Sequence, residues 1–542
     1  MSIPKPSSES APSSPDTGGQ LSGQMSGQLS MLPASPGGTE VRYAVGPIEP
    51  ELVDDLESFA RAGGSVVLVP AADDPATVRL GGVEVIGRLP RTEWFVTLAE
   101  RPERVRLDGE VPVTSSLAVL RPCAPGVDVA ATTSIHFEHR PTITVRRVGA
   151  GRVITTGVTD LRALVAQPSL ARFVERLGRP DFGTTPATTI GVGVVGYGPF
   201  GGMGHLHGLA TTETDGLALV AAADSVPARL TAARADFGDI ATYDSAEALA
   251  RDESVGVVIV ATPPVHHAGL ALDLLRAGKH VVVEKPMCLR TADADMLLAT
   301  ARDVDRTITV HQSRRWDTDW LALRRVVERG DLGDVFNIET FVGGFEHPCR
   351  AWHSEESVSG GAVYDWGSHH VDWILQAYGS PPARVLCTAH TRVWLDTTNV
   401  DQLSVWMQWA DGREATFRQS DVCAIRRPKF HVEGTSGTLE GYYEPVRQDA
   451  IVAGRGFLAA ESHHAERPVD LRVVRYDGDH GLVESHHTPA PHPGWGFHRN
   501  LADHLLLGES LAVRPEQSRD VVAVLEAAHR SGAEGGALIH LS

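Results

Sequence analysis

The sequence predicts an α/β protein with a doubly wound parallel sheet, followed by an α/β domain with an open, mainly antiparallel sheet and preceded by a small flavodoxin-like α/β domain. From Ile190 to about residue 310, short β-branched runs alternate with helical segments, as a parallel sheet requires. After His311, longer alternating runs such as 402–409 indicate antiparallel strands. The predicted strands of the parallel sheet include 217–223, 255–261 and 280–283, with helices over 227–237, 245–252 and 267–277.

Length and composition limit the class of protein. The 542 residues leave room for about three domains at roughly 150 residues each. The formal charge of -19 argues against a nucleic-acid partner, which needs clustered Lys and Arg. The 5 cysteines form no C-x-x-C pair, and no run approaches the ~18 apolar residues of a membrane helix. We therefore expect a cytoplasmic protein with neither a nucleic-acid nor a membrane partner.

Composition shifts along the chain predict the domain boundaries. The N-terminal segment is rich in Ser, Pro, Gly and Gln, which is typical of a disordered tail. A helix over 51–62, Gly63-Gly64 and a strand over 65–70 then open a small domain. The predicted divisions are a tail at 1–40, an α/β domain at 41–182, a dinucleotide-binding domain at 186–310 and a substrate-binding domain at 311–542.

A glycine-rich turn follows the first strand of the second domain. Gly196-x-Gly198-x-x-Gly201 lies between that strand and a helix, the context in which such glycines hold a dinucleotide pyrophosphate. Asp224 ends the next apolar strand, where a carboxylate binds the adenosine ribose and repels a 2′-phosphate. Its alternative role is to cap the following helix. The pattern favours NAD, and NADP stays the alternative because Arg229 could assist a phosphate.

Three further residues carry proton chemistry. Lys285 stands at the carboxyl end of the strand at 280–283, where open α/β sheets bind ligands. Asp365 and His369 are four residues apart, and on a helix they would share one face about 6 Å apart. Hydride transfer from an alcohol needs a proton acceptor and donors to the oxygen, which this set supplies. The alternatives are a buried structural pair or a metal site at His369-His370, and we expect no metal.

The chain from about Ile190 to Ser542 resembles the Gfo/Idh/MocA oxidoreductases. The resemblance implies a Rossmann domain, a second domain whose sheet supports homo-oligomers, and NAD(P)-dependent oxidation or reduction of a sugar, cyclitol or derivative. Two departures from the family pattern concern the cofactor. The family usually has G-x-x-H starting at the third glycine of the turn, whereas here it starts at Gly204, three residues after Gly201. Pro264 stands where the family usually has Asn. The matching motifs are the glycine turn, Asp224, 261–267, Glu284-Lys285-Pro286, Asp365-x-Gly367-x-His369-x-x-Asp372, and 434–440.

The resemblance also implies roles for individual residues. Lys285 polarises the substrate oxygen, Asp365 orients His369, and His369 exchanges the proton; whether Lys285 or His369 is the formal base stays open. The cofactor would contact Gly196, Gly198, Gly201, Asp224, Thr262, Pro263, His267, Glu284 and Lys285. The substrate pocket would include Arg315, Trp316, Trp352, His353, His370 and Asp372.

The domain at 41–182 resembles ThuA-type or class I glutamine-amidotransferase-like domains. The resemblance rests on 56–70, 92–95 and Gly149-x-Gly151. Cys123 is followed by Ala-Pro-Gly and not set in a nucleophile elbow, so we expect a non-catalytic module. For the whole chain, two alternatives to a dehydrogenase remain: a glycosidase of the same fold that recycles NAD, and a non-enzymatic sugar- or nucleotide-sensing regulator.

Overall fold

In the computed structural model the chain forms two compact units, the first ending at Thr184 and the second beginning at Thr185. The predicted tail lies outside the described residues except for 29–31. The structure describes residues 29–31, 41–71, 74–98, 110–135, 138–166, 170, 173–174, 177–178, 189–199, 202–348, 351–425, 427–446, 462–468, 470–489 and 494–541.

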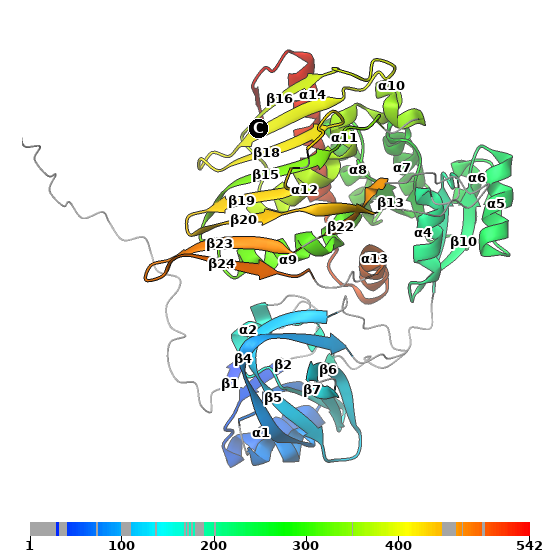
Figure 1. The fold of residues 1–542 in the computed structure, drawn as a ribbon. Helices are drawn as coiled ribbons and strands as arrows, with labels where there is room; N and C mark the ends of the chain where they lie inside the picture. Colours follow the sequence, from blue (N-terminus) through cyan, green and yellow to red (C-terminus); the bar gives the residue numbers. More distant parts are fainter. Residues whose placement is uncertain are drawn as a thin grey trace, which may run out of the picture. The chain divides into compact units, whose positions relative to one another are not determined.

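The first unit is built on an 8-stranded mixed sheet in the order β1-β2-β3-β8-β7-β6-β4-β5 (Figure 1). Strands β2, β3 and β8 are parallel neighbours, and the pairs from β8 to β5 are antiparallel. The elements are β1 (Leu29–Met31), β2 (Val41–Val45), α1 (Pro50–Arg61), β3 (Ser65–Val69), β4 (Val83–Leu98), β5 (Glu110–Pro122), β6 (Val127–Ile135), β7 (Glu138–Val148), β8 (Gly151–Thr156) and α2 (Leu161–Ala166).

This topology corrects the expectation of a flavodoxin-like domain. The predicted helix at 51–62 and strand at 65–70 are confirmed as α1 and β3. However, β4 to β7 run as successive antiparallel strands instead of β–α–β units. Buried and exposed residues largely alternate along β5, the pattern of an antiparallel strand with one face in the core and one face in water. The face in water needs no helix to cover it.

The second unit begins with a 6-stranded parallel sheet in the order β11-β10-β9-β12-β13-β14, the Rossmann arrangement. The strand order reverses at β9, so a crevice opens between the carboxyl ends of β9 and β12. The predicted strands and helices are confirmed. The elements are β9 (Ile190–Val195), α4 (Met203–Thr212), β10 (Leu217–Ala223), α5 (Pro227–Phe237), β11 (Ala241–Tyr243), α6 (Ala246–Ala250), β12 (Val257–Val260), α7 (His267–Arg276), β13 (His280–Glu284), α8 (Thr291–Asp303) and β14 (Ile308–His311).

A 9-stranded sheet follows, in the order β24-β23-β20-β19-β15-β18-β17-β16-β25. Only its β15–β18 pair is parallel, which confirms the expected open, mainly antiparallel sheet. Helices cover one face, where alternate residues of β17 are buried (Figure 1). The elements are α9 (Thr318–Glu328), β15 (Val335–Gly343), α12 (Gly367–Tyr378), β16 (Arg384–His390), β17 (Gln402–Gln408), β18 (Glu414–Ser420), β19 (Phe430–Gly434), β20 (Gly437–Gly441), β23 (Leu471–Asp477), β24 (Gly481–His487), α14 (Pro515–Ala533) and β25 (Ile539–His540).

The two sheets of the second unit are joined by side-chain contacts. The carboxylate of Glu526 in α14 accepts hydrogen bonds from the backbone N–H and the hydroxyl of Thr291 in α8. A further helix, α13 (Gly496–Leu507), packs Phe497 edge-on against Trp316. These contacts fix the parallel sheet against the second domain, so side chains from both can meet in one site.

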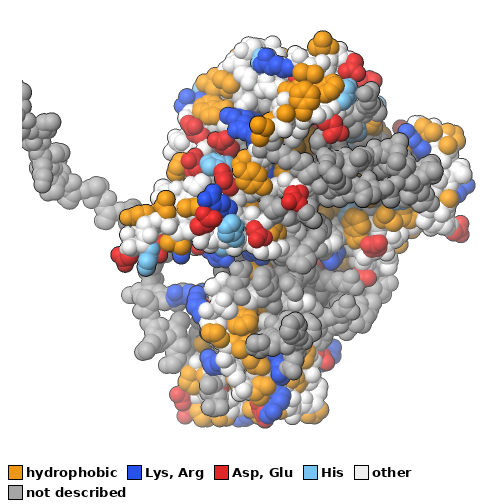
Figure 2. All heavy atoms as spheres, viewed as in Figure 1, with side chains coloured by type: hydrophobic (Ala, Val, Ile, Leu, Met, Phe, Trp, Pro, Cys, Tyr) orange, Lys and Arg blue, Asp and Glu red, His pale blue; other side chains and the backbone are white. Residues whose placement is uncertain are grey.

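The surface mixes charges of both signs. On the face seen in Figure 2, Lys and Arg side chains are interspersed with Asp and Glu over the described residues. Acidic groups outnumber basic ones across the whole sequence, which carries a net charge of -19. Among the helices that the structure describes, none is both long enough and apolar enough to cross a bilayer.

Candidate active site

The glycine turn after β9 has the backbone that the sequence predicts. Gly196 and Gly198 adopt φ values of 86° and 71°, which L side chains rarely tolerate. A Cβ at Gly204 would lie 2.4 Å from the carbonyl oxygen of Gly196, so Gly204 makes the close helix-to-turn packing expected of the third glycine. Gly201, to which the prediction gave that role, lies outside the described residues.

The Asp224 carboxylate accepts hydrogen bonds from two separate segments of the backbone. One carboxylate oxygen accepts a 3.0 Å hydrogen bond from the backbone N–H of Gly198, and the other accepts one of 2.9 Å from Val226 at the start of α5. Arg229 lies 3.4 Å from both oxygens. The carboxylate thus holds the glycine turn and the short turn that leads into α5, at the strand end where a dinucleotide ribose binds.

The residues of this crevice fit a dinucleotide. The first N–H groups of α4 have no side-chain cap, so they are available to an anionic pyrophosphate. Thr262 and Pro263 follow β12 and are half-buried, and the Thr262 hydroxyl has no hydrogen-bond partner among the described residues. The buried ring of His267 instead lies 2.7 Å from the carbonyl oxygens of both Thr262 and Pro286. His267 therefore positions the two loops, which corrects its expected contact with the cofactor.

Lys285 and Asp365 form the centre of the candidate site. The Lys285 ammonium donates hydrogen bonds to the Asp365 carboxylate at 2.7 Å and to its carbonyl oxygen at 3.1 Å. Lys285 follows β13, and Asp365 ends the short helix α11 (Ala362–Asp365) of the second domain. The Lys285 side chain is still 20% exposed, so it can also donate to a bound ligand.

The charge of Lys285 acts on the nearby imidazole of His369. Burial, together with the positive charges of Lys285 and Arg314, holds the pKa of His369 well below its ordinary value. The imidazole is therefore neutral near pH 7, and its Nδ1 has no hydrogen-bond partner among the described residues. The expected arrangement, in which Asp365 orients His369, is replaced by the Lys285–Asp365 pair. Asp365 ends α11 and His369 lies in the first turn of α12, with Trp366 between the two helices.

Asp421 is a functional candidate that the sequence analysis missed. It directly follows β18, and removal of its carboxylate from solvent, with the nearby charges of Asp401 and Asp365, raises its pKa to about 7. A perturbed carboxylate beside a candidate catalytic pair is typical of functional sites. The sequence held no signal for it, because Asp421 and Asp365 are brought together only by the fold.

The predicted substrate contacts of Arg315 and Asp372 are corrected by the structure. The Arg315 guanidinium makes a two-point ion pair with the Asp372 carboxylate at 2.8 and 2.6 Å, and both side chains are buried. Arg315 also donates to the carbonyl oxygen of Ala512 and to Gln517. These contacts occupy the polar groups, so the pair supports the fold and does not face a substrate.

Aromatic candidates divide between the core and the site. Trp316 is buried against α13, and the His370 ring lies on Phe417 with a centroid separation of 4.8 Å. Both are core residues, so their assignment to the substrate pocket is corrected. Trp352 and His353 instead stack on each other with centroids 3.6 Å apart and stay half-buried, so they remain candidates for the pocket wall.

Glu284 is also corrected as a cofactor contact. Its carboxylate is buried and accepts hydrogen bonds from His207, His311 and the backbone N–H of Lys285. Although burial by itself raises it, contacts with His311 and His207 hold the pKa of Glu284 well below its ordinary value. Glu284 thus fixes the backbone from which the Lys285 side chain extends.

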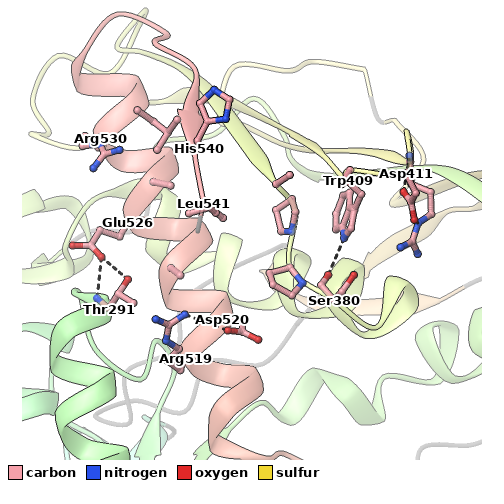
Figure 3. Close-up of a pocket in the computed structure, with 18 residues that line it drawn as sticks. Thr291, Ser380, Trp409, Asp411, Arg519, Asp520, Glu526, Arg530, His540 and Leu541 are labelled. Atoms are coloured by element: carbon pink, nitrogen blue, oxygen red, sulfur yellow. Dashed lines mark hydrogen bonds and ion pairs between the residues drawn. The ribbon is translucent and has the colours of Figure 1, made fainter.

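A separate cavity of about 610 Å³ lies between α14, β25 and the loops that flank β16 and β17 (Figure 3). Arg519, Asp520, Glu526 and Arg530 of α14 line one side, and Trp409 donates a hydrogen bond to the carbonyl oxygen of Ser380 on the other. None of the residues predicted for the active site lines this cavity.

Comparisons with known proteins find matches to both domains of the second unit. Residues 190–312 match the family of oxidoreductases with an NAD-binding Rossmann fold, GFO_IDH_MocA, and residues 320–440 match the GFO/IDH/MocA C-terminal domain. The second unit, which both models match, belongs to the Gfo/Idh/MocA oxidoreductase family, as its motifs predict. It is therefore an NAD(P)-dependent dehydrogenase or reductase that acts on CH–OH groups.

Individual relatives cover the second unit. The chain is 26% identical to the scyllo-inositol 2-dehydrogenase (NADP(+)) IolW of Bacillus subtilis, over 65% of this chain and 96% of that protein. It is 28% identical to the inositol 2-dehydrogenase of Rhizobium meliloti, over 54% of this chain and 80% of that protein. The crystal structure of an NAD-binding protein from Listeria innocua superposes with a TM-score of 0.54 at 26% identity, covering 65% of this chain and 97% of that one.

Proposed function

We propose that this protein transfers a hydride between nicotinamide and the hydroxyl-bearing or keto carbon of a sugar, cyclitol or derivative. The observation that carries the proposal is the Lys285–Asp365 pair at the carboxyl end of the parallel sheet, beside the neutral ring of His369. The two inositol dehydrogenases among its relatives support this substrate class.

Each side chain has a distinct role in the proposed reaction. Lys285 donates a hydrogen bond to the substrate oxygen and stabilises the charge that develops there. Asp365 holds the Lys285 ammonium in place. The neutral ring of His369 has one nitrogen free of a proton, so it can accept the hydroxyl proton. The bound nicotinamide supplies or accepts the hydride.

Lys285 and His369 are both candidates for the formal base. If His369 is the base, His369→Asn removes the acidic limb of the pH profile of kcat/KM while Lys285→Arg keeps it. If Lys285 is the base, Lys285→Arg abolishes turnover, because an arginine does not lose its proton. The pH profiles of the two variants therefore assign the proton exchange.

A substrate panel tests the proposed function. Cyclitols, aldoses and amino sugars are incubated with NAD or NADP, and the formation of reduced nicotinamide is followed by absorbance. We expect continuous reduction with at least one polyol and none with Lys285→Ala, which still binds the cofactor. Turnover without net reduction would indicate the glycosidase alternative. Cofactor binding without turnover of any compound would indicate the regulator.

We also propose that the protein forms homo-oligomers through the open face of its 9-stranded sheet. This face, opposite the covering helices, carries the half-buried side chains of Leu386 and Trp406 on adjacent strands. Analytical ultracentrifugation tests the proposal. Trp406→Arg should lower the mass of the assembly, whereas Met296→Arg on the exposed surface of α8 should not.

We also propose that the first unit is a non-catalytic module. Cys123 directly follows β5, and its thiol is free and exposed. Cys123→Ser should therefore leave turnover unchanged with every substrate that the panel identifies. A loss of activity in this variant would assign a nucleophile to the first unit.

A further inference from the structure

Three buried histidines of the second unit come together from separate elements. His207 lies in α4, His311 ends β14, and His498 lies in α13. Their ring centroids are 4.5, 5.2 and 5.4 Å apart. One ring nitrogen of each residue lies within 4.8 Å of those of the other two. Such a triangle needs a reason, since buried imidazoles rarely gather by apolar packing alone.

Glu284 orients two of these rings. One oxygen of its carboxylate accepts hydrogen bonds from Nε2 of His207 at 3.0 Å and from Nδ1 of His311 at 2.7 Å. This leaves Nδ1 of His207 and Nε2 of His311 as the nitrogens that can bind another group. Nδ1 of His207 already lies 3.0 Å from Nε2 of His498. A carboxylate that holds the outer nitrogen of a histidine is the common support of a metal ligand.

We propose that His207, His311 and His498 bind a divalent transition-metal ion, with Zn²⁺ the best match, and that Glu284 orients two of the three ligands. Imidazole is a preferred ligand of Zn²⁺, which binds nitrogen at about 2.0–2.1 Å in tetrahedral geometry. Tetrahedral ligands at that distance are about 3.3 Å apart. The 3.0 Å separation of the His207 and His498 nitrogens is close to that value.

The electrostatics of the cluster also suit a cation. The carboxylate of Glu284, in contact with two of the rings, brings a negative charge to this buried place. A divalent ion compensates that charge, and the three protein ligands leave a fourth position for a water molecule.

The ion would act on the active site through Glu284. The second carboxylate oxygen of Glu284 accepts a 3.0 Å hydrogen bond from the backbone N–H of Lys285. By fixing Glu284 the ion would hold the chain segment that carries Lys285, and by binding His498 it would hold α13 against the parallel sheet. In this proposal the metal is a positioning element and takes no part in hydride transfer.

Metal analysis of the untagged full-length protein tests the proposal. We expect one zinc ion per chain by mass spectrometry after growth with added zinc, loss of the ion with a chelator, and a rise in the melting temperature when Zn²⁺ is returned. Co²⁺ added to the metal-free protein should give the absorption bands of a tetrahedral site. His498→Gln should abolish the bound zinc and the Co²⁺ absorption bands. His504→Gln, on the same helix, should retain both.

Two results would overturn the site. The first is wild-type protein that holds no zinc after this preparation and whose melting temperature does not change with Zn²⁺. The second is equal zinc content in the wild type and in His498→Gln, which would indicate adventitious binding elsewhere. If His498→Gln does not fold, the titration of the metal-free wild type decides by itself. None of these readouts uses enzyme activity, so the result is independent of the proposed function.

Discussion

The Lys285 ammonium lies 2.7 Å from the carboxylate of Asp365, and this contact spans the parallel sheet and the second domain. Lys285 extends from the end of β13, and Asp365 from the end of α11. The Lys285 ammonium is thus held between the parallel sheet, which is expected to bind the cofactor, and the second domain, which is expected to bind the substrate. The contact thus gives Asp365 a position at the Lys285 ammonium.

Loss of either partner should impair turnover more than cofactor binding. We expect Lys285→Ala and Asp365→Asn each to lower kcat/KM by about 10²–10⁴-fold, because the first removes the positioned donor to the substrate oxygen and the second removes the carboxylate that holds this donor. Steady-state kinetics and fluorescence titration with the reduced cofactor measure the two effects. Asp244→Asn, on the exposed surface of the same domain, is the control. An Asp365→Asn variant with normal kcat/KM would contradict the assignment.

Asp421 should make the folded protein less stable as the pH rises, the opposite of the usual effect of a carboxylate. Its pKa is raised to about 7 in the folded protein, mainly by loss of solvent, against about 3.9 in the unfolded chain. The folded state therefore binds the extra proton, and the stability that this proton contributes is lost as the pH rises through about 7. Asp421→Asn removes this loss, so its stability relative to wild type should increase from about pH 4 to about pH 7, the interval between the two pKa values. Urea unfolding at several pH values checks this, and a constant difference would contradict it.

The sequence predicted the backbone of the site better than its side-chain contacts. The glycine turn, Asp224 and Lys285 were predictable because local motifs and strand ends determine where they lie. By contrast, the Arg315–Asp372 pair and the carboxylate of Asp421 depend on contacts between residues far apart in the chain. A charged residue near a motif reads the same in sequence whether it faces the substrate or is buried in an ion pair.

The Arg315–Asp372 pair should stabilise the fold. Both side chains are almost fully buried, at 7% and 2% exposure, so removal of one charge leaves the other without compensation. We expect Asp372→Asn to lower the free energy of unfolding by about 3–5 kcal/mol. Glu516→Gln breaks the exposed ion pair with Arg302 and should change it by less than about 1 kcal/mol. Denaturant titration compares the two variants. A stable Asp372→Asn protein with a raised KM would instead restore Asp372 as a substrate contact.

Asp224 should set the preference between the two nicotinamide cofactors. Its carboxylate lies at the end of β10, where it would repel the 2′-phosphate of NADP, while Arg229 at 3.4 Å could attract that phosphate once the carboxylate is removed. We expect Asp224→Ser to shift the ratio of kcat/KM for NADP over NAD upward by about tenfold or more, equivalent to ~1.4 kcal/mol. The double variant Asp224→Ser, Arg229→Ala should lose most of this shift, and kinetics with both cofactors measures it. If the single variant lost activity equally with both cofactors, the role of Asp224 would be confined to the hydrogen bond that holds the glycine turn at Gly198.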